Sequence, residues 1–277
     1  MMQPIYLPTN VKPAYQLNWG LTLFPRSHTL SFDLPDLAEA TEQDGVRILK
    51  STTTNSSNLQ FLVSTRPNVC GSSIVRSVKG RLQYLVRNSH PKAFQRNYCL
   101  RSIGSATRET VERYVDDQLG HHAMADPMVQ TRLNKYQRRF PVDLSRVCSS
   151  AHGRYWYNLH LVLVNQERRN EVRADKFSSL LTMIERCARK YEHRISHVAV
   201  LCDHIHLVFG ANITESPEGI ALKYLTNCEV VCEMRPIFKF SYYVERSASM
   251  TLGGFDVGCQ THAPLGQAQW GFRCGGY

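Results

Sequence analysis

Apolar and polar positions along the chain repeat one order of predicted elements twice. Residues 14–24 and 154–164 are both rich in aromatic and β-branched side chains, and each segment predicts an opening strand. A helical pattern and a second strand follow each of them, at 33–43 and 45–53 in the first run and at 175–193 and 194–202 in the second. The order of elements is therefore the same in both halves of the chain.

Further alignments complete each run. Residues 57–80 align with 203–226 as a strand, a polar loop and a helix, and residues 97–107 align with 241–251 as a last strand. Each run thus predicts the order β-α-β-β-α-β, with both helices on one face of an antiparallel sheet. We expect an α+β fold of two tandem ferredoxin-like (RRM-like) units. The alternative is two unrelated α+β units that share the pattern by chance.

The repeat also predicts the domain organisation. Residues 1–122 form the first unit and residues 153–277 the second. The stretch between them lacks periodicity and carries the charged segment KYQRR, so residues 123–152 are predicted to be a linker with one helix of its own.

The charge balance favours an acidic partner. The chain has 33 Lys and Arg against 23 Asp and Glu, a formal net charge of +10. Long-range electrostatics of this sign attract polyanions, and nucleic acid is the first candidate. A soluble protein with a basic surface and no such partner is the alternative.

Neither a membrane span nor a cysteine framework is indicated. No stretch approaches the about 18 apolar residues that a membrane helix needs, and the N-terminal residues do not resemble a secretion signal. The nine cysteines form no CxxC pair, so we expect free thiols in a cytosolic protein and favour no metal or redox role for Cys228 and Cys232.

Two histidines stand one residue apart in the apolar run CDHIHLVFG, residues 202–210. Alternate side chains of a strand share a face, so His204 and His206 are predicted to project together while Ile205 and Leu207 face the core. Two imidazoles that project side by side from one strand suit a divalent cation, and Asp203 is well placed to orient them.

The segment HVAVLCDHIHLVF, residues 197–209, resembles a known family. Two histidines around one hydrophobic residue are the HUH motif, and the segment is similar to single-tyrosine transposases of the insertion-sequence-200/605 type, including their REP-associated relatives. The resemblance implies a ferredoxin-like sheet, Mg²⁺ or Mn²⁺ on the two histidines, and a tyrosine on a later helix that attacks the scissile phosphate of single-stranded DNA. It also implies a glutamine ligand one turn beyond that tyrosine, and a location in the bacterial cytosol.

The tyrosine and the glutamine of this pattern stand in the first run. In RETVERYVDDQLG, residues 108–120, Tyr114 and Gln118 are spaced i and i+4, Thr107 can cap the helix and Gly120 can end it. The second run has Gly258 at the position of the tyrosine, in a glycine-rich stretch that does not favour a helix.

The histidines are lost from the run that keeps the tyrosine, because Asn58 and Gln60 occupy their places. The resembled enzymes are homodimers whose sites combine the histidines of one subunit with the tyrosine helix of the other. The resemblance therefore implies a monomeric pseudo-dimer with one composite site: Tyr114 as nucleophile and His204, His206 and Gln118 as metal ligands.

The expected activity is metal-dependent nicking and strand transfer of single-stranded, hairpin-forming DNA through a 5′-phosphotyrosine. The alternatives are a non-catalytic binder of hairpin DNA or RNA and a metal-dependent hydrolase without a covalent intermediate. Tyr277 is a less favoured alternative nucleophile.

Basic helix positions are candidates for holding the DNA backbone. They are Arg76, Lys79 and Arg81 in the first unit and Arg186, Arg189 and Lys190 in the second. The alternative for each is an ordinary solvated helix face. Trp156, Tyr242 and Tyr243 are candidates for stacking on bases, although aromatic residues in strands more often belong to the core.

Overall fold

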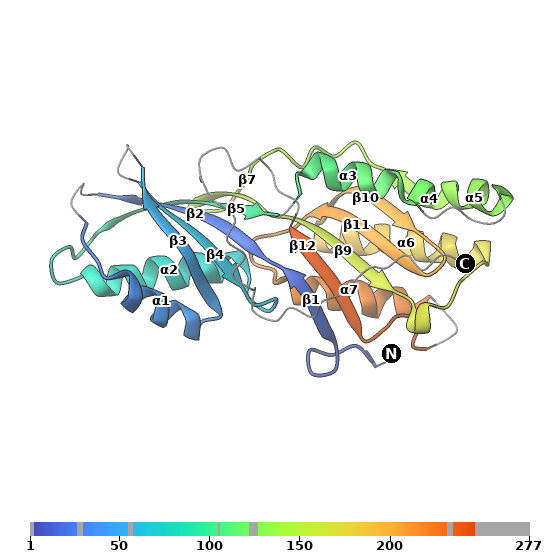
Figure 1. The fold of residues 1–277 in the computed structure, drawn as a ribbon, viewed down its shortest axis with the longest axis horizontal. Coiled ribbons are helices and arrows are strands. Elements are labelled where there is room, and N and C mark those ends of the chain that lie inside the picture. The colour runs from blue at the N-terminus through green and yellow to red at the C-terminus, as the bar shows by residue number, and fades with distance from the viewer. Residues whose placement is uncertain are drawn as a thin grey trace.

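The computed structural model describes residues 3–26, 30–54, 58–104, 106–121, 127–231 and 235–246. They form two six-stranded sheets, each with a pair of helices on one face (Figure 1). The predicted α+β class with two tandem ferredoxin-like units is confirmed. No helix in these ranges combines the length and apolar character needed to cross a bilayer.

The first sheet has the strand order β3-β4-β2-β5-β8-β7. Its strands are β2 (Asn18–Pro25), β3 (Val46–Thr53), β4 (Leu59–Thr65), β5 (Phe94–Ile103), β7 (Cys148–Ser149) and β8 (Gly153–Trp156). Helices α1 (Leu34–Gln43) and α2 (Gly71–Val86) pack against each other and against this sheet. The four strands from β2 to β5 have the order of the split βαβ arrangement.

The second sheet has the order β1-β12-β9-β11-β10-β6. Its strands are β1 (Lys12–Gln16), β6 (Gln137–Arg139), β9 (Asn158–Val164), β10 (Arg194–Val200), β11 (His204–Gly210) and β12 (Ser241–Arg246). Helices α6 (Ala174–Tyr191) and α7 (Pro217–Val230) pack together on one face, and the short turn η2 (Gln166–Arg168) follows β9. The strands β9 to β12 repeat the order of the first unit, as the alignment of the two runs predicts.

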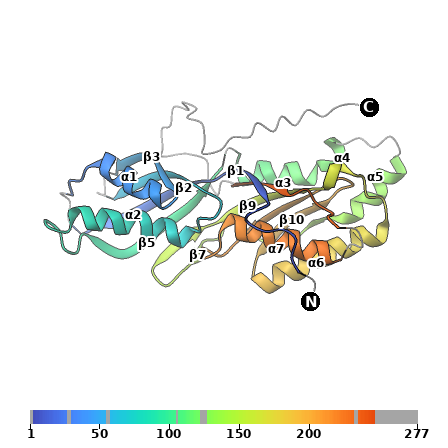
Figure 2. The same ribbon diagram turned by 90° about the horizontal axis from the view of Figure 1, so that it is seen from below.

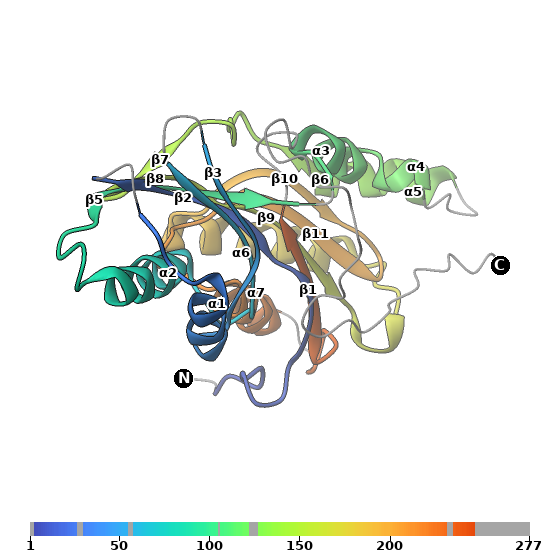
Figure 3. The same ribbon diagram turned by 60° about the vertical axis from the view of Figure 1, so that its left-hand side comes forward.

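The two units exchange their first strands. Each predicted opening strand is in fact two strands in different sheets: β1 pairs parallel with β12 of the second unit, and β8 pairs parallel with β5 of the first (Figures 1 and 3). The chain passes from one sheet to the other at Leu17 and Tyr157, both fully buried. The prediction of single, purely antiparallel opening strands is therefore wrong at this point, because residue periodicity does not show where a strand changes partner.

The exchange creates a continuous core between the units. Trp19 of β2 and Tyr157 lie with ring centroids 5.0 Å apart, and the Arg246 guanidinium lies over the Trp19 ring. All three side chains are buried, and one apolar cluster extends from Leu37 in α1 to Phe177 in α6. Buried contact of this kind is typical of an obligate interface rather than of a flexible pair of domains.

The described residues that follow β5 form further helices and strands. Helices α3 (Arg108–Asp116) and α4 (Gln118–His121) end the first unit. Helix α5 (Pro127–Leu133), the short turn η1 (Asn134–Tyr136) and the edge strands β6 and β7 lie in the segment between the units. Helix α3 follows β5 of the first unit but packs on β10 and β11 of the second. Figure 2 shows α3 on one side of the second sheet and α6 and α7 on the other.

Candidate active site

Strand β11 presents its two histidines on the face that α3 covers. Ile205, Leu207 and Phe209 point into the core on the side of α6 and α7, so His204 and His206 project from the opposite face, as the alternation predicts. The two imidazole rings meet edge to face with centroids 4.8 Å apart, and both side chains are buried.

Helix α3 carries Tyr114 to these histidines. Val111 and Val115 on one side of the helix pack against Ala199 of β10 and Val208 of β11 in a separate small apolar cluster. The Tyr114 ring lies edge-on to His206 with centroids 5.6 Å apart, and 43% of the tyrosine is exposed. The structure therefore brings the tyrosine of the first run and the histidines of the second together, with the tyrosine open to solvent.

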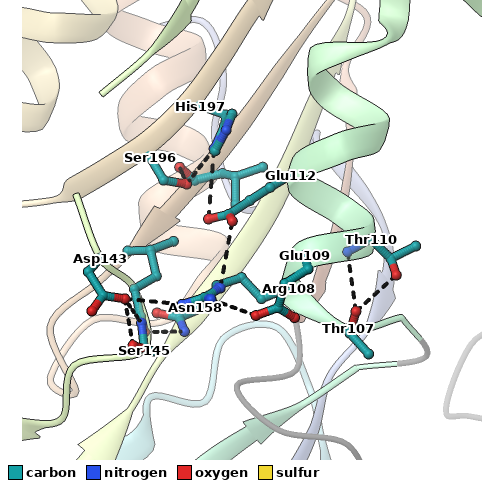
Figure 4. Close-up of polar contacts among 12 residues, drawn as sticks. Thr107, Arg108, Glu109, Thr110, Glu112, Asp143, Ser145, Asn158, Ser196 and His197 are labelled. Carbon is teal, nitrogen blue, oxygen red and sulfur yellow. Dashed lines mark hydrogen bonds and ion pairs between the residues drawn. The ribbon is translucent and has the colours of Figure 1, made fainter. Parts of the chain in front are cut away.

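The beginning of α3 is fixed by polar contacts (Figure 4). Thr107 caps the helix as predicted, since its hydroxyl accepts a hydrogen bond from the Thr110 amide at 3.2 Å. Arg108 Nη1 contacts Asp143 at 3.2 Å, and Glu112 faces His197 of β10 at 3.7 Å. The contact with His197 ties the helix to the second unit, and the contact with Asp143 ties it to the segment between the units.

A hydrogen-bonded chain of three side chains orients His206. His160 of β9 stacks on His206 and its Nε2 lies 2.8 Å from His206 Nδ1, while its Nδ1 lies 3.0 Å from Glu245 Oε1 of β12. An ionised carboxylate only accepts, so His160 donates to Glu245 and His206 donates to His160. This direction leaves the lone pair of His206 on Nε2, the nitrogen available to a metal.

Burial alone would raise the pKa of Glu245, but the hydrogen bonds from His160 and Tyr243 outweigh it and hold the pKa below the ordinary range. Tyr243 also donates to this carboxylate at 2.8 Å. The sequence reasoning missed His160 and Glu245. The signal for His160 was present, because it is a lone histidine in an otherwise apolar opening strand.

Asp203 orients the other histidine. Its Oδ1 lies 2.5 Å from His204 Nδ1, and its Oδ2 accepts from Arg168 at 2.9 Å. Burial would raise the pKa of Asp203, but His204 and Arg168 together hold it well below the usual value. The ionised Asp203 fixes the Nδ1 proton of His204, so Nε2 of this ring also carries the lone pair.

Gln118 is fully buried at the start of α4, directly after the end of α3. Its Nε2 donates to the Tyr114 carbonyl at 2.8 Å, and its Oε1 makes no hydrogen bond within the described ranges. A buried amide oxygen and two imidazole Nε2 atoms are donor types that suit a divalent cation. The role of Gln118, His204 and His206 as ligands of one ion stays a prediction. Clusters of three or more His, Cys, Asp or Glu with metal-binding geometry are absent from the described residues, and Gln118 lies outside those residue types.

The counterpart of this site in the first unit has no histidine. Gln60 of β4 pairs with Thr22 of β2 just as His206 pairs with Val162 of β9, and Asn58 precedes β4 as a half-buried residue. Gly258, the other residue assigned to the lost site, lies outside the described residues.

The basic candidates lie on α2 and α6. Helix α6 covers the face of the second sheet opposite to His204 and His206, and α2 covers the corresponding face of the first sheet. Arg76, Arg186, Arg189 and Lys190 are exposed on α2 and α6. Lys79 donates to the Gln95 and Arg96 carbonyls, and Arg81 pairs with Asp44 at 3.1 Å. A role for these six residues in holding DNA stays a prediction.

The described cysteines are free thiols, as expected. They are Cys70, Cys99, Cys148, Cys187, Cys202 and Cys228. Cys232 and the alternative nucleophile Tyr277 lie outside the described residues.

A family comparison matches the chain in two segments, one in each of the two repeated runs. The family described as "Transposase IS200 like" matches residues 36–118 and 154–227, more than half of the chain. The chain belongs to the IS200-like transposase family. The first matched segment of this IS200-like protein ends at Gln118 and contains Tyr114, and the second contains both histidines. No curated protein matches the chain.

Proposed function

We propose that this IS200-like transposase nicks and rejoins single-stranded DNA through one composite active site. The observation that carries the proposal is the edge-to-face contact of Tyr114 from the first unit with His206 from the second, 5.6 Å between centroids. A tyrosine that served only to pack α3 would be expected to be buried, whereas Tyr114 is 43% exposed.

Tyr114 is the proposed nucleophile. Its phenolic oxygen attacks the scissile phosphorus, the phenolic proton leaves, and the bond from phosphorus to the 3′-oxygen breaks. The 3′-oxygen takes up a proton and departs as a hydroxyl, and the 5′-phosphate stays on the tyrosine. Attack by the 3′-hydroxyl of another strand reverses these steps and joins the strands, so no energy source is required.

His204, His206 and Gln118 are the proposed ligands of Mg²⁺ or Mn²⁺. A bound cation would act as a Lewis acid on the scissile phosphate and neutralise the charge that develops there. Asp203, and the pair His160 and Glu245, hold the two imidazoles in the tautomer that presents Nε2. Because these partners are in place in the protein alone, the ligands need little rearrangement to bind.

Covalent capture tests the proposal. Single-stranded hairpins labelled at the 3′ end are incubated with Mn²⁺ and the protein, and the products are separated under denaturing conditions. We expect labelled protein from the wild type and none from Tyr114→Phe or His204→Ala. Tyr84→Phe is the matched control, because Tyr84 is an exposed tyrosine on α2 of the first unit and should leave the adduct unchanged.

The position of the label separates the alternatives. Hairpins labelled at the 5′ end should give a shorter free strand ending in a 3′-hydroxyl and no labelled protein. Cleavage without any adduct would indicate a hydrolase, and binding without cleavage would indicate a non-catalytic DNA-binding protein.

A further inference from the structure

One face of the first sheet corresponds to the face of the second sheet that carries His204 and His206. The side chains on this face of the first sheet are of different types. Strand pairing places two rows of side chains on this face, away from α1 and α2. One row is Lys50, Leu62, Gly20, Arg101 and Trp156, and the other is Thr52, Gln60, Thr22, Cys99 and Arg154. We call these ten positions the open face.

The second sheet has the same two rows with other residues. There the rows are His197, Val208, His160, Glu245 and Gln16, and Ala199, His206, Val162, Tyr243 and Ala14. Position by position, Gln60 replaces His206, Gly20 replaces His160 and Arg101 replaces Glu245. The carboxylate and both imidazoles of the hydrogen-bonded chain are thus absent from the open face, and a cation stands where the carboxylate was.

The open face is positively charged. Lys50, Arg101 and Arg154 lie on three different strands, and none of the ten positions is acidic. Arg101 and Arg154 are exposed. Cations that are spread over three strands suit an extended polyanion such as a phosphate backbone better than a single small anion.

An aromatic side chain lies next to Arg101, at one end of the open face. The Trp156 ring is half-buried and lies under the Arg101 guanidinium at 4.7 Å, and its Nε1 donates to the Ser145 carbonyl at 2.7 Å. The ring is therefore held in one orientation. Beside it is a hollow of about 550 Å³ lined by Phe24, Asn97, Cys99, Arg101, Arg154 and Trp156.

We propose that the open face is a metal-independent binding platform for single-stranded DNA. The arginines contact phosphates, and a base takes the place of the Arg101 guanidinium on the Trp156 ring, beside the hollow. An aromatic ring on a flat sheet can reach bases only when they are unstacked, which favours a single strand over a duplex. The platform adjoins the composite site along the chain, because β8 continues through Tyr157 directly into β9, the strand of His160.

Binding of a fluorescein-labelled thymidine 12-mer in EDTA tests this platform apart from the chemistry at Tyr114. We expect Arg101→Glu and Arg154→Glu each to weaken binding about 10-fold or more. The slope of log affinity against log salt should fall by about 0.7 for each phosphate that the variant no longer neutralises. Arg87→Glu is the matched control, because Arg87 is exposed at the end of α2, on the helix side of the same sheet. It should change the affinity by less than about 3-fold.

Tryptophan fluorescence gives a second readout. The 12-mer should quench the emission of the wild type and of Tyr114→Phe, and the quenching should disappear in Trp156→Phe if this ring stacks on a base. Circular dichroism melting confirms that each variant is folded.

Three outcomes would overturn the platform: equal weakening in the Arg87→Glu and Arg101→Glu variants, quenching that persists in Trp156→Phe, or tighter binding of duplex DNA or of a uridine 12-mer than of the thymidine strand. Because Tyr114→Phe is expected to bind normally, loss of the covalent adduct and loss of platform binding are distinguishable. Failure of one does not imply failure of the other.

Discussion

Tyr114 and His206 lie on elements of different units, and their rings meet nearly at right angles, with an interplanar angle of 84°. The contact exists because α3 crosses from the end of the first unit onto the second sheet. A site built in this way depends on the docking of α3, on the orientation of the imidazoles and on the presence of both parts in one chain. Each dependence leads to a prediction.

The partners of His206 should control metal affinity. His160→Ala removes the acceptor of the His206 Nδ1 proton, and we expect Mn²⁺ binding to weaken about 10- to 100-fold, as is usual when the partner of a metal-binding histidine is removed. Isothermal titration calorimetry without DNA measures this directly. Glu245→Gln should weaken binding less, because an amide oxygen still accepts from His160 Nδ1.

Unchanged Mn²⁺ affinity in His160→Ala would show that the histidine chain is a packing feature only. Tyr243→Phe serves as the control: it removes one hydrogen bond to Glu245 but leaves both histidines in place, and should change the affinity by less than about 3-fold.

Substitutions at equivalent positions of the two sheets should have unequal effects on Mn²⁺ binding. His206→Ala removes a proposed ligand, whereas Gln60→Ala alters the corresponding position of the first sheet, which lacks the histidine partners. We expect the first variant to lose Mn²⁺ binding and the second to retain it, with a stoichiometry of one ion per chain by calorimetry. Two ions per chain, or loss of binding in Gln60→Ala, would contradict a single composite site.

Docking of α3 should be required for cleavage but not for folding. Val115→Asp places a charge in the small apolar cluster with Ala199 and Val208, and burial of an unpaired carboxylate costs several kcal/mol. Because this cluster is separate from the main core, we expect faster amide hydrogen exchange in residues 108–116 and loss of the covalent adduct while the sheets remain protected. Glu109→Gln, at an exposed position of the same helix, is the control. Global unfolding of Val115→Asp would show that α3 belongs to the main cooperative unit.

The sequence predicts those features of the fold that depend on residues close together along the chain, and it does not predict those that depend on distant ones. The order of helices and strands within each unit follows from local periodicity, and the placement of His204 and His206 on one face follows from the alternation of β11. The exchange of β1 and β8 does not, since the change of sheet at Leu17 and Tyr157 is decided by pairing with strands far away in the sequence. The roles of His160 and Glu245 were missed for the same reason, because their contact joins two distant strands.

An acidic group outside the site should contribute to stability in a pH-dependent way. Glu215 hydrogen-bonds His193 Nε2 at 3.0 Å and pairs with Lys223. Burial would raise its pKa, but these two partners outweigh burial and lower it. A carboxylate whose pKa is lower in the folded than in the unfolded protein stabilises the fold above its unfolded pKa, and this stability is lost as the pH falls through the folded pKa.

We therefore expect Glu215→Gln to reduce the free energy of unfolding at neutral pH by about 1–3 kcal/mol. The difference from the wild type should shrink in acid, where the wild-type carboxyl is also protonated. Urea denaturation at both pH values measures it. Glu39→Gln, on the exposed side of α1, should stay within about 0.5 kcal/mol of the wild type at either pH, and a pH-independent loss of stability in Glu215→Gln would rule out the ionic contribution.

The most direct test of the composite site is a mixing experiment with the covalent adduct as its readout. Tyr114→Phe and His206→Ala are incubated separately and as an equimolar mixture with Mn²⁺ and 3′-labelled hairpins, beside the wild type. Since both units of the site belong to one chain, we predict an adduct from the wild type alone. An adduct in the mixture would show that the site forms between two chains, and an adduct on Tyr114→Phe would show that another residue is the nucleophile.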